Sequence, residues 1–490
     1  MDCRLYPRPV PITTPDRAAG NRLQIWIGLF DVTAAPPLQW LVNGTPAAPT
    51  SIAPLGAVRD ARLVAADVPR AFSGIYEFAG LQPDTSYTFT ADVGGERVSV
   101  AARTLPNELP AGLNNALHVL LVSCYYQPED RSELVSAVIR RLSGSVAPQL
   151  TLLMGDQVYL DLPTLTDFED DAAWLAGWFE GYYTRNWRGP GGLTAILSSA
   201  PCISIPDDHE YWNNAPHFSP IVGNTKSVAG RERWRTAAEM LYRGFQLAAP
   251  LGVGDPFILD IPPLSFFLAD SRSRRNEDRG QTMTPQVIQA LQAWCDRMAQ
   301  ERLFGVFVAG QSLYDTPVGT LKGSVADYSL ANYADYPDMI RALMSVPDRG
   351  LPLLCLTGDV HWGRVTQCVD VSLARNVLYE VISSPSALVS SVGIDQWKKV
   401  GGFLGGLFGK RDPWPRHSNP EKAPDFLATD VLDKRYRSDD LYGQTGDHVV
   451  LLSFTRAGIG VDVRVTYYPI HQDTRVEQPI SVGPLLLRPL

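Results

Sequence analysis

Four short segments of this chain carry side chains that bind metals or move protons, and each follows an apolar run. The segments are Ser123–Cys124, Gly155–Tyr159 (GDQVY), Asp207–Glu210 (DDHE) and Gly358–His361 (GDVH). One such ending carries little information, because aspartate suits turns and helix caps at the end of any buried strand. Four such endings in one chain are poorly explained as four unrelated turns or caps. We therefore predict that the four segments build one shared metal site.

These residue types suit a pair of metal ions. Asp156 can bridge two ions with its two carboxylate oxygens, and Gly155 allows the backbone to approach closely. Asp359 and His361 lie at positions i and i+2, so on an extended strand both side chains would face the same metal pair. Two metals about 3.5–4 Å apart can hold the attacking and the leaving oxygen of an in-line phosphoryl displacement. The pattern therefore indicates phosphoryl chemistry.

The apolar runs before these segments predict the strands that position them. Runs such as ALHVLLV, QLTLLM, PCISI and LPLLCLT do not alternate, which is typical of strands covered on both faces. Stretches with helical spacing, including RSELVSAVIRRL and PQVIQALQAWCDRMAQ, lie between several of the strands. This order indicates an α/β domain, in which sites are built at the carboxyl ends of strands. The closing HVVLLSFTRAGIGVDVRVTYYP predicts a β-hairpin that completes a sheet.

The N-terminal part has a different pattern. From Leu23 onward, short strands are separated by turn residues, which predicts an all-β domain at residues 20–105. LQPDTSYTF (Leu81–Phe89) resembles the tyrosine corner of a fibronectin- or immunoglobulin-like sandwich, although any β-hairpin with a Pro-Asp turn would look similar. We expect a proline-rich arm at residues 1–19 before this domain and a linker at residues 106–116 after it.

Composition excludes several classes of protein. The chain has 490 residues, 45% hydrophobic and 19% charged, which is typical of a globular protein with two domains. Its net charge of -9 disfavours a stable complex with nucleic acid. No apolar run is long enough to span a membrane, and the N-terminus lacks the apolar core of a signal peptide. We expect a cytoplasmic protein, or a periplasmic or secreted one if a leader has been removed; the oligomeric state stays open.

Taken in order, the motifs resemble those of the calcineurin-like metallophosphoesterases, and within them the alkaline phosphatase D (PhoD-like) family. The general superfamily pattern is DxH, GDxxD, GNHE and GHxH; here GDQVY, DDHE and GDVH stand for the last three. VSCYYQP replaces the first DxH, as in the PhoD-like family, and DSRSRR, VAGQ and EVISSPS also resemble that family. The resemblance covers about residues 20–490. It implies a four-layer β-sandwich flanked by helices as the catalytic domain at 117–490, preceded by the all-β sandwich.

The resemblance also implies the metals. A tyrosine at the end of GDxxY resembles the purple acid phosphatases, in which phenolate binds ferric iron. The implied Fe3+ site consists of Cys124, Asp156, Tyr159 and His361. The implied second site consists of Asp156, Asp208 and Asp359, where oxygen-only ligation suits Ca2+, with Mg2+, Mn2+ or Zn2+ as substitutes.

Other residues are assigned to catalysis and substrate binding. His209, in the DDHE motif, is expected to act as a general acid or to stabilise the leaving oxygen. Arg272 would hold phosphate, unless it belongs to a solvated charge cluster. Asn213 would touch Ca2+ or substrate, unless it only forms a turn. Gln311 would donate a hydrogen bond or coordinate Ca2+ weakly. Asp207 would bind a further metal or orient its neighbours.

We therefore expect an alkaline phosphatase D-like phosphoric ester hydrolase, in which a metal-activated hydroxide attacks phosphorus. Its substrate would be a small phosphate ester or a phospholipid or nucleotide diester; we expect broad activity that includes diesters, and the preference between monoesters and diesters stays open. One alternative is a non-catalytic metal-containing binding protein, against which the intact His209 argues. Another is a hydrolase of phosphotriesters or phosphonates on the same scaffold. The segment at 390–446 is expected to be an irregular insertion over the core or a lid.

Overall fold

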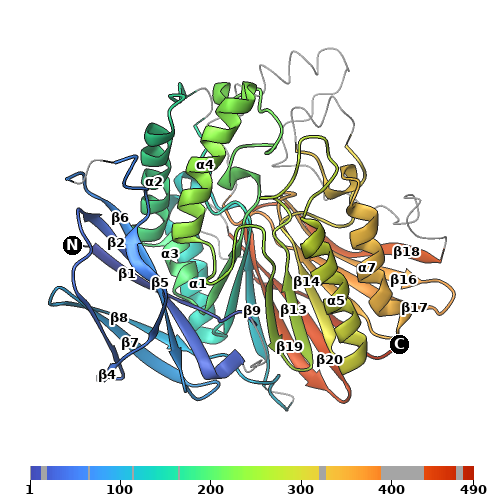
Figure 1. The fold of residues 1–490 in the computed structure, drawn as a ribbon. Coiled ribbons are helices and arrows are strands. Elements are labelled where there is room, and N and C mark those ends of the chain that lie inside the picture. The colour runs from blue at the N-terminus through green and yellow to red at the C-terminus, as the bar shows by residue number, and fades with distance from the viewer. Residues whose placement is uncertain are drawn as a thin grey trace.

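The computed structural model describes residues 2–12, 19–64, 67–112, 115–163, 166–318, 327–387, 435–470 and 478–490. Over these residues the chain is a mixed α/β protein with several sheets and few helices (Figure 1). Two four-stranded sheets form in the N-terminal part, and one six-stranded and one seven-stranded sheet form in the remainder. The α/β prediction is confirmed at this level.

The N-terminal sheets have the strand orders β1-β2-β6-β5 and β4-β3-β7-β8, and all their pairings are antiparallel. The strands are β1 (Asp2–Arg8), β2 (Arg22–Val32), β3 (Leu38–Val42), β4 (Thr45–Ala47), β5 (Thr50–Ala57), β6 (Arg70–Ala79), β7 (Ser86–Val93) and β8 (Glu96–Arg103). Buried apolar side chains of both sheets, among them Ile27 and Phe89, form one hydrophobic cluster. The two sheets therefore pack face to face.

Two features of this N-terminal part bear on the sequence predictions. Asp2–Arg8, within the segment expected to be an arm, forms strand β1 and pairs along its length with β2. As an edge strand, β1 can accommodate Pro7, which is why a proline-rich composition did not exclude a strand here. The hydroxyl of Tyr87 accepts a hydrogen bond from the backbone N–H of Gln82 at 2.9 Å, which is the contact expected of a tyrosine corner.

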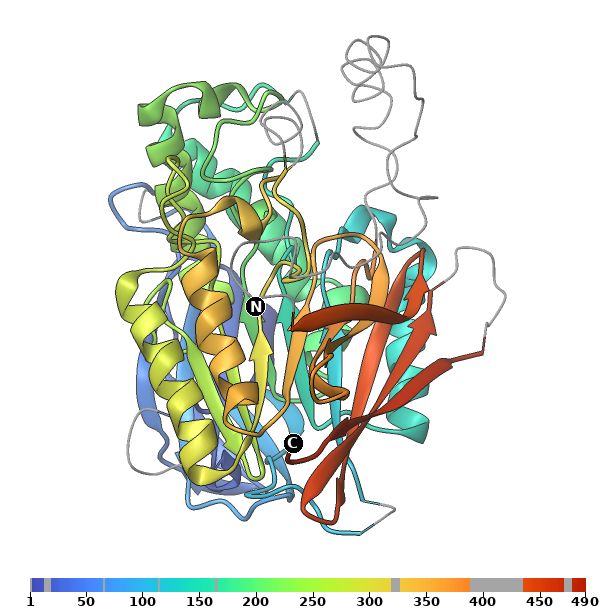
Figure 2. The ribbon, with the colours of Figure 1, turned by 90° about the vertical axis from the view of Figure 1, so that its right-hand side faces the viewer.

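The larger sheets have the orders β11-β10-β9-β19-β20-β21 and β12-β13-β14-β15-β17-β16-β18. The strands are β9 (Leu117–Val122), β10 (Leu150–Met154), β11 (Cys202–Ile205), β12 (Phe257–Ile261), β13 (Leu264–Leu268), β14 (Phe304–Val308), β15 (Leu353–Thr357), β16 (Gly363–Asp370), β17 (Arg375–Ile382), β18 (Tyr436–Gln444), β19 (His448–Ala457), β20 (Gly460–Pro469) and β21 (Ile480–Leu487). Side chains of both sheets, such as Leu121 and Leu354, share one hydrophobic cluster. Figure 2 shows the strands of the two sheets from the side.

Strand direction decides where the site lies. In the six-stranded sheet β9, β10 and β11 run parallel, and in the seven-stranded sheet β13, β14, β15 and β17 run parallel. Parallel neighbours end at the same edge of a sheet, so each sheet collects several carboxyl ends at one edge. The predicted closing hairpin is present as β19 and β20, and β19 pairs antiparallel with β9.

Helices cover the outer faces of the two larger sheets. They are α1 (Leu134–Ser145), α2 (Ala172–Arg188), α3 (Gly192–Leu197), α4 (Val228–Phe245), α5 (Pro285–Glu301) and α7 (Tyr336–Asp348). The capping residue of α2 is Asp171, whose carboxylate accepts the backbone N–H of Trp174 at 2.8 Å.

Trp26 of β2 packs in the same hydrophobic cluster as α2 and α4 and donates its indole N–H to the carbonyl of Gly244 at 2.7 Å. The N-terminal sheets are thus anchored to the helical layer.

Most of the insertion expected at 390–446 falls on residues 388–434, which lie outside the described residues. The part that is described forms β18, which pairs with β16 at the edge of the seven-stranded sheet.

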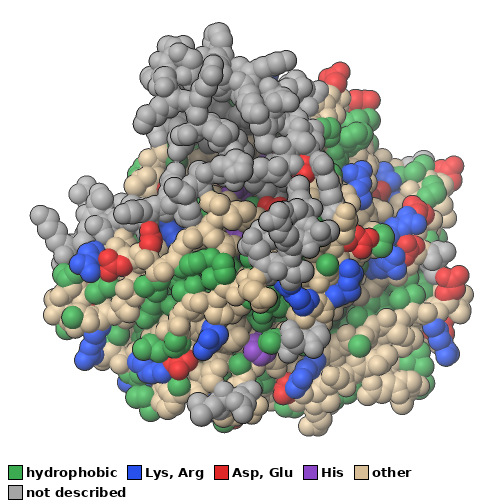
Figure 3. Space-filling model, turned by 180° about the vertical axis from the view of Figure 1, so that it is seen from behind, with side chains coloured by type: hydrophobic (Ala, Val, Ile, Leu, Met, Phe, Trp, Pro, Cys, Tyr) green, Lys and Arg blue, Asp and Glu red, His purple; other side chains and the backbone are tan. Residues whose placement is uncertain are grey.

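Among the helices of the described ranges, none is both long enough and apolar enough to span a bilayer. On the face seen from behind, basic and acidic side chains are interspersed (Figure 3).

Candidate metal centre

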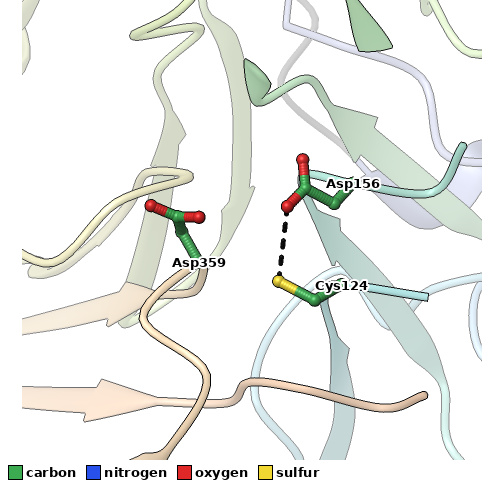
Figure 4. A group of neighbouring side chains, drawn as sticks. All are labelled: Cys124, Asp156 and Asp359. Carbon is green, nitrogen blue, oxygen red and sulfur yellow. Dashed lines mark hydrogen bonds between the residues drawn. The ribbon is translucent and has the colours of Figure 1, made fainter. Parts of the chain in front are cut away.

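The four predicted segments meet where the parallel strands end. Cys124 follows β9, Asp156 follows β10 and Asp208 follows β11, so one sheet supplies three of the side chains. Asp359 follows β15 and comes from the other sheet. Figure 4 shows Asp359 facing the pair formed by Cys124 and Asp156. The site therefore lies between the two sheets, at the edge where their parallel strands end.

Three groups of side chains in the described residues could each hold a metal ion. They are Cys124, Asp156 and Asp359; Asp156, Asp208 and His209; and Asp207, Asp208 and Asp359. Within each group the ligand atoms lie within 4.8 Å of one another. Asp156 belongs to the first two groups, as a bridging carboxylate would. The Sγ of Cys124 donates to Oδ2 of Asp156 at 3.4 Å, the contact drawn in Figure 4.

The backbone at this site is strained. Cys124, Asp156, Asp359 and His361 all have positive φ values, of 51°, 59°, 66° and 61°. Non-glycine residues rarely adopt this conformation, and it clusters at functional sites because surrounding contacts must impose it. Gly155 has a φ of +94°, and a Cβ atom there would lie 2.5 Å from Cβ of Asp207. The expected close backbone approach beside Asp156 is therefore present.

Buried acids dominate the electrostatics. Burial raises the pKa of Asp156 and of Asp359 well above the usual range, and Asp207 and Asp208 add to this effect for both. Burial also raises the pKa of the Cys124 thiol, as do the nearby Asp156 and Asp359 carboxylates. Buried carboxylates repel one another unless a cation or proton compensates them. This donor set is therefore suited to cations.

Tyr159 places a phenol in the same region. Its side chain is 2% exposed, and its hydroxyl is buried with no hydrogen-bond partner in the described part of the chain. Burial raises the pKa of this phenol well above the usual value, and Cys124 and Asp156 raise it further. A buried hydroxyl without a partner is costly, so a partner of another kind is expected. The residue fits a phenolate ligand to a metal.

His361 has a different position from the one expected. Strand β15 ends at Thr357, so Asp359 and His361 are not on an extended strand and the alternation argument for them was wrong. Left-handed backbone at both residues turns the chain instead. The N–H of His361 donates to Oγ of Ser384 at 3.1 Å, and this hydroxyl donates to Sγ of Cys124 at 3.2 Å. Ser384 thus ties His361 to the cysteine, although none of the three described ligand groups includes His361.

His209 lies beside a carboxylate that the sequence analysis did not single out. Its Nδ1 is 2.8 Å from Oδ1 of Asp161, whose side chain is fully buried. Its ring lies over the ring of Tyr159, with centroids 4.1 Å apart. Burial alone would lower the pKa of His209, but Asp161 foremost, and then Asp208 and Asp156, raise it well above its usual value. The position of Asp161, five residues after Asp156, was the one available signal for this pairing.

Glu210 connects the segment that contains Asp156 with the segment that contains Asp207. Its carboxylate accepts the backbone N–H groups of Asp156 at 2.9 Å, Gln157 at 2.7 Å and Asp207 at 2.9 Å. The side-chain amide of Gln246, the residue directly after α4, also donates to the Glu210 carboxylate, at 3.2 Å. Four donors on one buried carboxylate hold the two metal-ligand segments at a set spacing. The glutamate of the DDHE motif is therefore a structural clamp.

Arg272 and Gln311 belong to a buried polar network beside the acids. Nε of Arg272 donates to Asp207 at 2.5 Å, and its remaining nitrogens contact Asp327 and the carbonyl of Ala215. Gln311 donates from Nε2 to Asp327 and, at 3.0 Å, to Oδ2 of Asp359. The guanidinium of Arg272 is fully buried, which places it among carboxylates instead of in a solvated cluster.

Asn213 lies in the turn after the DDHE segment. Its backbone N–H donates to Oδ2 of Asp161 at 2.9 Å, and the N–H of Asn214 donates to Oδ2 of Asp208 at 2.7 Å. Oδ1 of Asn213 is buried with no hydrogen-bond partner in the described residues. The turn thus orients both acids and leaves one amide oxygen of Asn213 for a ligand.

Comparison with solved structures bears on the fold alone. A structure described as the structure of PhoD matches with a TM-score of 0.60 and 14% sequence identity, covering 98% of this chain and 88% of that one. GAP50, described as the anchor in the inner membrane complex of Plasmodium, matches with a TM-score of 0.37 and 8% identity, covering 75% of this chain and 89% of that one. No protein-family model and no curated protein sequence matches the chain.

Proposed function

We propose that this chain, which has a PhoD-like fold, is a metal-dependent hydrolase of phosphate esters of the alkaline phosphatase D type. The observation that supports it is the convergence of buried carboxylates and one thiol from both sheets, with Asp156 shared between two ligand groups. The order of the sequence motifs along the chain also supports the proposal. The two-sheet core with helices on its outer faces suits the four-layer sandwich of such enzymes, and the N-terminal sheets with their tyrosine-corner contact suit a fibronectin- or immunoglobulin-like domain.

The donor types divide into two sites. Cys124, Asp156, Tyr159 and His361 would hold Fe3+, since phenolate and thiolate are anionic donors that favour the ferric ion. Asp156, Asp208 and Asp359 would hold Ca2+, with Mg2+, Mn2+ or Zn2+ as substitutes, because carboxylate oxygens suit hard cations. Bound ions would supply the Lewis acidity that activates water and neutralises phosphoryl charge. The unpartnered phenol of Tyr159 and the strained ligand backbone are the structural reasons to expect metals here.

His209 and Asp161 have a separate task. Asp161 accepts the imidazole Nδ1–H and favours the charged form of the ring. A protonated imidazole can give its Nε2 proton to the oxygen of a departing alcohol. Arg272 is engaged with two carboxylates, so its role is to fix Asp207 and Asp327. Gln311 is likewise engaged with Asp327 and Asp359, whereas Asn213, whose Oδ1 has no partner among the described residues, is the candidate for contact with substrate. The substrate is a small phosphomonoester or diester, or a phospholipid or nucleotide diester.

Metal removal and return test the proposal. Dialysis against chelator should remove the metals and abolish hydrolysis of bis(4-nitrophenyl) phosphate, and Fe3+ with Ca2+ should restore it. Elemental analysis of protein purified without chelator should find iron and calcium together. Zinc or manganese without iron would reject the ferric site but keep a hydrolase. A folded protein that neither holds nor rebinds metal would reject the metal-dependent mechanism, and one that holds metal but hydrolyses no ester would point to the metal-containing binding protein.

The substitution Tyr159→Phe tests the phenolate ligand. We expect the loss of a visible absorption band from phenolate to Fe3+, because only the tyrosyl oxygen can supply it. Tyr126→Phe is the matched control, since its ring lies 5.3 Å from that of Tyr159 and is also buried. A visible spectrum of the iron-loaded variants checks this. Because the Cys124 thiolate can give a visible band of its own, the outcome that would remove Tyr159 from the iron site is an unchanged spectrum in Tyr159→Phe, or a phenolate band that vanishes in the control alone.

A further inference from the structure

A hollow lies directly beside the acidic cluster. It has a volume of about 260 Å³ and is lined by Asn214, His217, Phe218, Arg231, Glu277 and Tyr328. One of its lining residues, Asn214, also contacts the acidic cluster, because its backbone N–H donates to Oδ2 of Asp208 at 2.7 Å. The loop is closed by a hydrogen bond from the N–H of His217 to the carbonyl of Asn214 at 2.9 Å. A group bound here would therefore lie next to Asp208.

Three of the six lining residues carry aromatic rings, namely His217, Phe218 and Tyr328, and the other three are polar or charged. The rings of His217 and Tyr328 lie 4.6 Å apart, and the guanidinium of Arg279 lies 5.1 Å from the ring centre of Tyr328. Phe218 is 43% exposed, which is high for a phenylalanine that lines a hollow. Aromatic faces of this kind stack on planar rings.

Charge in the hollow is balanced. Nε and Nη2 of Arg231 each donate to the carboxylate of Glu277 at 2.8 Å, and Nη1 donates to the carbonyl of Thr225 at 2.7 Å. Burial lowers the pKa of His217 to about 4, so its imidazole is neutral near neutral pH. Arg231 is the one cation among these lining residues and is already paired, and Arg279 lies against Tyr328 outside the lining. The hollow suits an uncharged group.

The position of the hollow indicates which part of a substrate it takes. The imidazole of His209 faces Tyr159 and Asp161, and we assign the departing alcohol to that imidazole. The turn at residues 213–214 contacts Asp161 through the N–H of Asn213 and Asp208 through the N–H of Asn214, and of these two asparagines Asn214 lines the hollow. The hollow would therefore hold the ester group that stays on phosphorus, which a phosphomonoester lacks.

We propose that this hollow is a subsite for a planar aromatic ring on the retained ester group, so that ring-bearing phosphodiesters are the preferred substrates. This inference rests on the proposed hydrolase function. It assigns Phe218 as a specificity-determining residue that touches substrate away from the metal ligands. Stacking of one ring on an exposed aromatic side chain contributes about a tenfold preference.

A series of diesters with one leaving group tests the subsite. Each substrate has 4-nitrophenolate as the leaving group and phenyl, thymidine or methyl as the retained group. We expect kcat/KM of the metal-loaded protein to be about tenfold higher for the ring-bearing diesters than for the methyl diester. Phe218→Ala should reduce this ratio to about one, and Phe218→Tyr should keep it. A higher value for thymidine than for phenyl would identify a nucleoside, and equal values would identify any aryl group.

A control and a binding measurement separate the possible failures. Trp178→Ala, on α2, removes an aromatic side chain that is 37% exposed and should leave the ratio unchanged. A ratio near one in the native protein, or one that Phe218→Ala does not alter, would overturn the subsite while the hydrolase stands. If no ester is hydrolysed, the proposed function fails. In that case the affinities for phenylphosphonate and methylphosphonate, measured by calorimetry, test the subsite. A tenfold higher affinity for phenylphosphonate that is lost in Phe218→Ala supports the subsite. Equal affinities for the two phosphonates overturn it.

Discussion

Replacing Asp156 with asparagine should remove most of the bound metal and nearly all hydrolysis. Asp156 belongs to two of the three ligand groups, as Asp208 and Asp359 also do. It is the residue that we propose to bridge both metals, so one change weakens both sites. The asparagine side chain has nearly the shape of aspartate but lacks the negative charge that would bind the two bridged cations. If the metals stabilise the transition state by about 4 kcal/mol, their loss lowers kcat/KM about a thousandfold. Metal analysis and diester hydrolysis, measured on the same preparation, check this.

The fold of Asp156→Asn should survive. In the metal-free protein the carboxyl group is buried among other acids, and its pKa is raised well above normal, so removing its charge relieves repulsion. Thermal unfolding of the metal-free variant should therefore occur at or above the native temperature. Asp260→Asn is the control, because Asp260 is also buried but pairs with Arg297 and lies outside the three ligand groups. Full activity with native metal content in Asp156→Asn would end the bridging assignment.

Replacing His209 with alanine should slow hydrolysis according to the leaving group. A general acid typically contributes about 10²–10⁴-fold, and this contribution is needed most when the departing alcohol is a poor leaving group. We expect a loss in that range for alkyl esters and a much smaller loss for 4-nitrophenyl esters, with most of the metal retained. His118→Ala is the control, since His118 lies on β9 and contacts Ser453 instead of the acidic cluster. Equal losses for both kinds of ester would remove the acid role.

Asp161→Asn tests the same pair through pH. Asp161 contributes most to raising the pKa of His209, so removing its charge should lower that pKa. The rate with an alkyl ester depends on the protonated ring and falls as pH rises through this pKa. The alkaline limb of the pH–rate profile should therefore move to lower pH in Asp161→Asn. An unchanged limb would mean that another group carries the proton.

Residue identity and order were enough to predict much of this site. Apolar runs without alternation located β9, β10, β11 and β15, and the residues after them became the centre. This succeeded because a strand covered on both faces needs a continuous apolar sequence, and because parallel strands end at one edge. Residue type and position after a strand alone predict Cys124, Asp156 and Asp359 as metal ligands. The structure brings these three within 4.8 Å of one another.

Three features could not be read from local pattern. The contact between Ser384 and Cys124 joins residues 260 positions apart, and the one between Arg272 and Asp207 spans 65 positions. Positive φ at Asp359 and His361 breaks the two-residue period on which their shared direction had been predicted. A proline-rich composition concealed β1, because an edge strand tolerates proline where a central strand does not.

The sequence by itself determined the kind of chemistry, because ligand type, strand period and motif order are properties of residues and their spacing. It specified carboxylates, a thiol and a phenol after strands, and a histidine beside them. Only the tertiary structure decided which of these meet. It paired Asp161 with His209, made Glu210 a clamp on two backbone segments, and placed Phe218 in a hollow beside Asp208. Such contacts follow from the packing of two sheets against each other, and a packing of distant strands leaves no period in the chain.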